Sequence, residues 1–173
     1  ISSMLLKEII ENPRQKTIIK LPSYTFSSTA NAYLRSNFNI SFLDVNTDDM
    51  IVNRNEYQKL KENEYLVSVN YANSTFEYPQ NYSHKLIEDA AQSFGVTYNK
   101  QPVGTFGRYG CVSFHPTKNL HAGYGGLIVV SDVEEFELAK TIWERGTDRN
   151  KVINGLKKKY EWVSMGSSFQ MTE

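Results

Sequence analysis

The chain has 173 residues, of which 40% are hydrophobic, and its 19 basic and 19 acidic residues cancel. This length fits one globular domain with a sizeable core. The balanced charge gives no reason to expect nucleic acid, a membrane surface or a polyanion as a partner. The single cysteine, Cys111, excludes an internal disulfide, and the three histidines show no metal-binding spacing. With no apolar run of about 20 residues and no basic-then-apolar leader, we expect no membrane partner and a cytoplasmic location.

Hydrophobic periodicity predicts helices alternating with short strands. In chain order these are a helix ended by Asn12 and Pro13, a strand over 17–21, a helix capped by Ser27 or Ser28 and running through Leu34, a strand over 40–44, a helix over 56–62, strands over 65–69 and 86–89, a strand running into Cys111, a strand over 127–130, and a helix from Ser131 or Asp132 through Trp143 that Gly146 could end. Strands separated by helices indicate an α/β fold with a mainly parallel sheet flanked by helices.

In such a sheet, ligands bind outside the carboxyl ends of the strands, which is where Asp89 falls. Ser113 ends a second apolar run, and Lys118 follows it five residues later. A carboxylate at one strand end, and a hydroxyl and a lysine at another, are the groups that hold pyridoxal 5'-phosphate (PLP). This stretch of the chain therefore predicts a PLP site.

Three sequence runs extend this interpretation, and through them the chain resembles the DegT/DnrJ/EryC1/StrS family of PLP-dependent nucleotide-sugar aminotransferases. The runs are Asp89-Ala90-Ala91-Gln92, then Ser113-Phe114-His115-Pro116-Thr117-Lys118-Asn119 with the Gly125-Gly126 pair, and residues 22–32 near the start, with further likeness at 144–150 and 159–162. The resemblance covers nearly the whole chain. It implies the large domain of a fold-type I, aspartate aminotransferase-like PLP-dependent transferase.

The resemblance also implies a role for each of five residues. Lys118 would form the Schiff base with PLP, and Asp89 would pair with the pyridinium nitrogen. Gln92 would hydrogen-bond the phenolic oxygen of the ring, Ser113 would donate to the phosphate, and Phe26 would stack on the ring. No metal is expected.

Each of these residues also has a purely structural interpretation. Lys118 could be a solvated surface charge, and Phe26 could be a core residue. Asp89 could be the N-cap of a helix starting at Ala90, with Gln92 as a surface residue of that helix. Ser113 could be a strand serine whose hydroxyl is hydrogen-bonded to the backbone. His115 is assigned a structural role, because a lysine released from the cofactor can itself move the proton.

The implied reaction is transfer of an amino group from glutamate to a nucleotide-linked 4-keto-6-deoxy sugar. Within the family the resemblance is to the branch that forms dTDP-4-amino-4,6-dideoxygalactose, which makes dTDP-4-keto-6-deoxyglucose the expected acceptor. The expected partners are therefore the nucleotide sugar, the amino donor and a second copy in a homodimer, in cell-surface polysaccharide biosynthesis. The alternative is a non-catalytic fragment or a degenerate relative that acts as a binding or assembly module.

The chain also departs from the family pattern. The Gly-Thr turn that helps bind the cofactor phosphate would fall at or before Ile1, Tyr124 replaces a usual glutamate, and Asn70 stands where a histidine is frequent. Residues 166–170 resemble the segment that reaches a neighbouring subunit. We therefore expect residues 1–173 to form a single PLP-binding large domain, truncated at both ends and without the C-terminal small domain.

Overall fold

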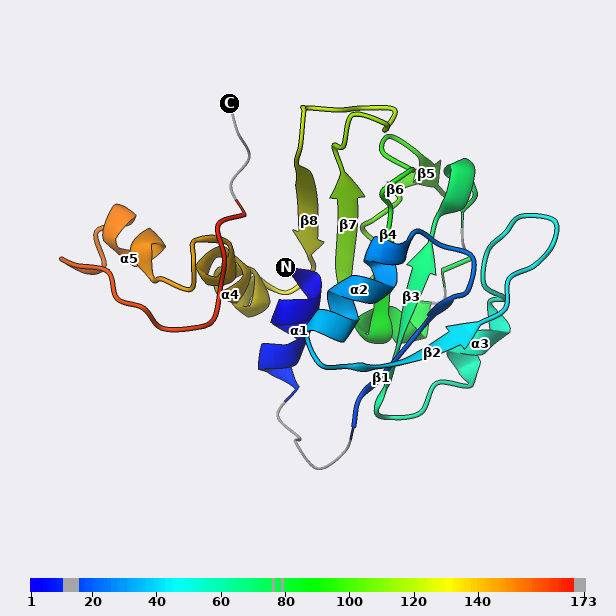
Figure 1. The fold of residues 1–173 in the computed structure, drawn as a ribbon, viewed down its shortest axis with the longest axis horizontal. Coiled ribbons are helices and arrows are strands. Elements are labelled where there is room, and N and C mark those ends of the chain that lie inside the picture. Colours follow the sequence, from blue (N-terminus) through cyan, green and yellow to red (C-terminus); the bar gives the residue numbers. More distant parts are fainter. Residues whose placement is uncertain (11–15, 76, 79, 170–173) are drawn as a thin grey trace.

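The computed structural model describes residues 1–10, 16–75, 77–78 and 80–169. The expected helix stop at Asn12 and Pro13 lies outside these residues. The described residues form a six-stranded sheet in the order β2-β1-β3-β4-β7-β8, with helices beside it (Figure 1). The α/β class predicted from the sequence is confirmed.

The strands of this sheet are parallel except for one pair. They are β1 (Ile18–Pro22), β2 (Asn39–Leu43), β3 (Glu64–Val69), β4 (Leu86–Asp89), β7 (Tyr109–Ser113) and β8 (Gly126–Val130), and a separate small hairpin pairs β5 (Thr97–Tyr98) with β6 (Gln101–Pro102). Only β7 and β8 pair in antiparallel orientation within the main sheet. The carboxyl ends of β1, β3, β4 and β7 therefore meet at one edge.

The helices are short. They are α1 (Ser2–Ile9), α2 (Ser27–Arg35), α3 (Asn55–Gln58), α4 (Val133–Trp143) and α5 (Arg149–Ile153), with 3-10 turns η1 (Tyr71–Asn73) and η2 (Gln80–Lys85). Figure 1 shows α1 and α2 in front of the sheet and α4 beside β8, while α5 and the segment after it extend away from the sheet.

The two faces of the sheet bury separate apolar clusters. On the face covered by α1, α2 and α4, the buried residues include Leu5, Ile19, Tyr33, Val67 and Ile142. On the opposite face, strand residues that alternate with these pack against α3 and neighbouring loops. The buried residues of this second cluster are Ile51, Val52, Tyr57, Leu66 and Leu86. Burial on both faces is what the apolar runs of parallel strands require.

Two predicted helix boundaries were wrong. The N-cap of α2 is Phe26, with no side-chain cap, and neither Ser27 nor Ser28 takes that position. The helix expected over 56–62 is reduced to the single turn of α3, in which only Tyr57 is buried. One buried side chain gives a longer amphipathic helix too little apolar surface to pack.

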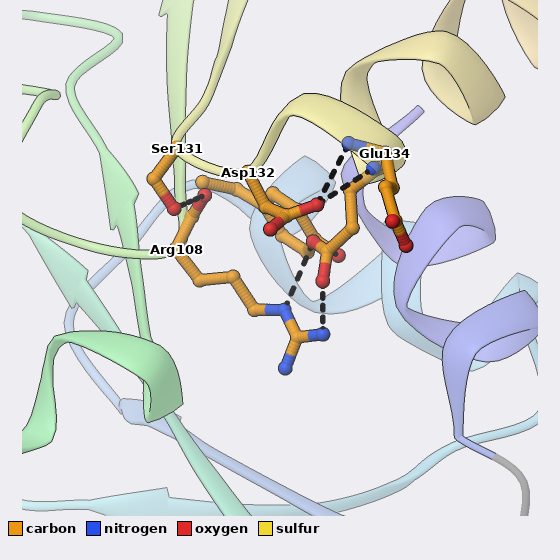
Figure 2. Close-up of polar contacts among 6 residues, drawn as sticks. Arg108, Ser131, Asp132 and Glu134 are labelled. Atoms are coloured by element: carbon orange, nitrogen blue, oxygen red, sulfur yellow. Dashed lines mark hydrogen bonds and ion pairs between the residues drawn. The ribbon is translucent and has the colours of Figure 1, made fainter.

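The predicted start of α4 is confirmed, and Asp132 rather than Ser131 is its cap. The Asp132 carboxylate accepts the backbone N–H groups of Glu134 and Glu135, both at 2.9 Å. In Figure 2 these two bonds lie at the first turn of the helix, while the Ser131 hydroxyl donates to the Arg108 carbonyl at 3.1 Å. The Arg108 guanidinium also forms an ion pair with Glu135. Polar contacts thus attach Ser131 and α4 to Arg108, which immediately precedes β7.

A buried carboxylate supports the loop behind β4. Glu88 is fully buried and accepts the backbone N–H groups of Gly104 at 2.7 Å, Phe106 at 2.6 Å and Gly107 at 2.8 Å. Burial raises the pKa of the Glu88 carboxyl, and the three N–H donors oppose that change. The loop approaches so closely that a Cβ at Gly110 would lie 1.8 Å from the Gly104 carbonyl oxygen.

Candidate functional site

A cavity of about 680 Å³ opens at the carboxyl ends of the parallel strands. This volume lies within the range of roughly 300–1,000 Å³ that is usual for small-molecule sites. Its floor is apolar, with Val67, Val69 and Ile87 from the sheet and Tyr33 from α2. All five residues proposed from the sequence line it: Phe26, Asp89, Gln92, Ser113 and Lys118. The fold therefore brings together side chains from three distant parts of the chain.

Asp89 is held in place at the end of β4. Its Oδ2 accepts the hydroxyl of Thr29 at 2.7 Å, and its Oδ1 accepts the N–H of Ala91 at 3.1 Å. Because the Thr29 proton is directed to Asp89, the 3.0 Å contact between Thr25 and Thr29 has Thr25 as donor. The chain after Asp89 forms turns and not a helix, so the alternative that Asp89 is a helix N-cap is wrong.

The two residues expected to contact a planar ring lie at the mouth of the cavity. Phe26 is 74% exposed, which excludes the alternative of a core residue. The Oε1 atom of Gln92 accepts the N–H of Ala72 at 3.4 Å, and its NH₂ group has no acceptor among the described residues. Ala72 has a left-handed backbone, φ 46° and ψ 42°, which is uncommon outside glycine.

Ser113 and Lys118 lie on the connection that follows β7. The turn between them is closed by the Lys118 N–H, which donates to the His115 carbonyl at 2.9 Å. Asn119 anchors the connection by donating to the Phe94 carbonyl at 3.0 Å. Among the described residues the Lys118 amine forms no ion pair, so its nitrogen is not committed to a carboxylate.

Sequence reasoning gave no role to two residues that shape this site, Thr29 and Glu88. Thr29 follows Phe26 by three residues at a helix start, a spacing that places both on one side of the first turn. Glu88 is an acid inside an apolar strand, followed by a glycine-rich loop that supplies its donors. An acidic residue in that pattern indicates a buried carboxylate that accepts hydrogen bonds from backbone N–H groups.

Two departures from the family pattern have a location in the structure. Asn70 is fully buried just after the carboxyl end of β3, where it lines the cavity and its Oδ1 accepts the Tyr78 hydroxyl at 3.0 Å. Tyr124 is 72% exposed, and its ring lies edge to face with His115, with centroids 5.3 Å apart. The predicted strand position of Cys111 is confirmed, and burial raises the pKa of its thiol to about 11, which leaves little reactive thiolate at neutral pH.

Other kinds of site are not supported within the described ranges. No group of three or more His, Cys, Asp or Glu side chains there could hold a metal ion. In the same residues, no helix has the length and apolar character needed to cross a membrane.

The fold and the cavity define a class of protein: a mainly parallel α/β domain with a carboxylate, a hydroxyl and a lysine at its strand ends, as in PLP-dependent transferases. The sequence matches the DegT/DnrJ/EryC1/StrS aminotransferase family over residues 3–173. The chain belongs to this family.

Two of the curated relatives are named as aminotransferases of UDP-linked sugars. The chain is 33% identical over 142 residues to the UDP-N-acetyl-3-dehydro-alpha-D-glucosamine 3-aminotransferase of Acidithiobacillus ferrooxidans, covering 76% of this chain and 37% of that protein. It is 29% identical over 169 residues to the UDP-4-amino-4,6-dideoxy-N-acetyl-beta-L-altrosamine transaminase of Campylobacter jejuni, covering 92% of this chain and 44% of that protein.

A solved structure of an aminotransferase has a similar fold. The fold superposes on Helicobacter pylori PseC, an aminotransferase of pseudaminic acid biosynthesis, with a TM-score of 0.81 and 25% identity over 98% of this chain and 47% of that chain. The chain thus spans less than half the length of these relatives.

Proposed function

We propose that this protein is a PLP-dependent aminotransferase that transfers an amino group from glutamate to the keto group of a nucleotide-linked sugar. The single observation that supports this most is the convergence of Asp89, Ser113 and Lys118 on one cavity from separate strand ends. Family membership supports the class of reaction. The finer proposal is a dTDP-linked 4-keto-6-deoxy sugar, dTDP-4-keto-6-deoxyglucose, as acceptor.

The residues of the cavity fit the cofactor in volume and in chemistry. The exposed ring of Phe26 can cover one face of the pyridine ring, and the free NH₂ group of Gln92 can donate to the phenolic oxygen. The Asp89 carboxylate, already oriented by Thr29 and Ala91, can accept a hydrogen bond from the protonated ring nitrogen. The hydroxyl of Ser113 can donate to the phosphate.

When bound, PLP supplies a ring that withdraws electrons from the carbon bearing the amino group. The Lys118 amine would hold the cofactor covalently and, once displaced by the amino donor, its Nζ would take the proton from the donor's α-carbon. Asp89 would keep the ring nitrogen protonated, because an ionised carboxylate favours a neighbouring cation. The apolar floor of Val67, Val69 and Ile87 would exclude water below the ring.

Replacing Asp89 by Asn should preserve most of the cofactor binding but lower turnover by about 10- to 1,000-fold. An adjacent carboxylate raises the pKa of a cation by about 1–3 units, and the neutral amide removes that preference. Steady-state rates with glutamate, and PLP affinity from absorbance, test this expectation. The matched control is Asp48→Asn at an exposed position, which should leave both quantities unchanged. Undiminished turnover in Asp89→Asn would remove the proposed role.

The acceptor is tested with the protein expressed in its natural reading frame, saturating PLP and glutamate. Amine formation is measured on dTDP-4-keto-6-deoxyglucose and on UDP-linked keto sugars, because the relatives named above act on UDP sugars. We expect amination of the dTDP sugar. Amination of UDP sugars alone would replace the finer proposal, and absence of both PLP binding and amination would contradict the function as a whole.

The proposal extends to the assembly and setting of the protein: a homodimer that works in the cytoplasm, in cell-surface polysaccharide biosynthesis. This proposal is supported by the resemblance of the chain to its family and by relatives that act on nucleotide-linked amino sugars.

A further inference from the structure

The wall of the cavity carries very little positive charge. Among the described residues that line it, Lys118 and His115 are the only ones with basic side chains. A phosphate carries up to two negative charges and is held by several converging donors. If Lys118 is used for the covalent link, His115 is the basic side chain that remains for an anion.

The orientation of the His115 ring follows from its contacts with Thr117. Nδ1 lies 3.2 Å from the Thr117 backbone N–H and 2.9 Å from the Thr117 hydroxyl. A backbone N–H can only donate, so Nδ1 is the acceptor and the proton of the neutral ring resides on Nε2. No described residue accepts a hydrogen bond from Nε2. The ring thus has a fixed tautomer and an uncommitted donor.

His115 and Ser113 also lie together on this wall. The His115 backbone N–H is 3.3 Å from Ser113 Oγ, which therefore acts as an acceptor there and keeps its own proton for another partner. Two donors have no acceptor among the described residues, the Ser113 hydroxyl and the His115 Nε2–H, and both residues line the cavity that contains the proposed cofactor residues.

We propose that His115 binds a phosphate group through Nε2–H in this cavity, which Ser113 also lines. The proposal rests on the proposed function for the source of the phosphate, which is either the phosphate of PLP or the diphosphate of the nucleotide sugar. This proposal replaces the purely structural role that was predicted for His115 from the sequence.

The test measures binding by NMR and by titration, independently of activity. The probes are PLP, pyridoxal, which lacks the phosphate, and UDP. In the wild-type chain, PLP, UDP or both should shift the ¹⁵N resonance of His115 Nε2, whereas pyridoxal should not. His115→Phe should weaken binding of the responding probe by roughly 10- to 150-fold, the range for a lost hydrogen bond to a charged group.

Two further variants separate binding from folding. His115→Gln keeps an N–H donor and should recover most of the affinity, while His121→Phe, at an exposed position outside the cavity, should match the wild type. Pyridoxal affinity reports whether the cavity is intact in each variant. A loss confined to PLP identifies the cofactor phosphate, and a loss confined to UDP identifies the substrate diphosphate.

Unchanged PLP and UDP affinities in His115→Phe would overturn the proposal. That result would leave the proposed function standing, because the covalent link to Lys118 is measured separately by reductive trapping. Conversely, a trapped adduct on another lysine would contradict the proposed function without affecting the phosphate measurement with UDP.

Discussion

Replacing Lys118 by Arg should abolish the visible absorption of the PLP-loaded protein and lower amino transfer by at least about 10²–10⁴-fold, the usual contribution of one acid–base group. Arginine keeps a positive charge in the cavity, but its guanidinium neither forms the covalent link nor gives up a proton near neutral pH. In the wild type, borohydride reduction followed by peptide mapping should find the phosphopyridoxyl group on Lys118.

The control for this prediction is Lys158→Arg, because Lys158 is exposed and remote from the residues that line the cavity. It should retain both the colour and the rate. A phosphopyridoxyl group mapped to any lysine other than Lys118, or a coloured and active Lys118→Arg protein, would show that the assignment is wrong.

Replacing Glu88 by Ala should lower the free energy of unfolding by about 3 kcal/mol or more, because three backbone N–H groups would lose their acceptor at about 1–3 kcal/mol each. These donors belong to Gly104, Phe106 and Gly107, of which the two glycines are buried. Urea denaturation monitored by circular dichroism measures the free energy of unfolding. Because Glu88 and Asp89 are neighbours in β4, PLP affinity should also fall.

Glu88→Gln provides an intermediate case. Its amide keeps one acceptor oxygen but turns an NH₂ group toward an N–H donor, so we expect a smaller loss than for Ala. Glu134→Ala on the exposed side of α4 serves as the surface control. A Glu88→Ala protein as stable as that control would mean that water or a rearranged loop replaces the carboxylate at no cost.

Much of the fold could be predicted from the sequence because the strands are buried runs with a simple apolar pattern. We predicted the strands ending at Val69 and Asp89 and the Asp132 cap of α4, because residues close in sequence determine these elements. The antiparallel pairing of β7 with β8 was not predicted. The connection over 114–125 contains no helix, and a parallel crossover normally needs one.

The candidate site residues were proposed from family resemblance, whereas the contacts that support them were not predicted. Thr29 contacts Asp89 across 60 positions of sequence, so no local pattern reports that bond. The first turn of α2 directs the Thr29 hydroxyl at the cavity and not at its own backbone, and Phe26 takes the N-cap position without a side-chain cap. Tertiary contacts of this kind override local preference.

The packing of α1 against α4 ties an early part of the chain to a late one. Leu5 and Leu6 are fully buried, in a cluster that also contains Ala139 and Ile142 of α4. During synthesis at about 5–20 residues per second, the roughly 130 intervening residues would take about 7–26 s to emerge. For that interval the apolar face of α1 lacks its contacts with α4.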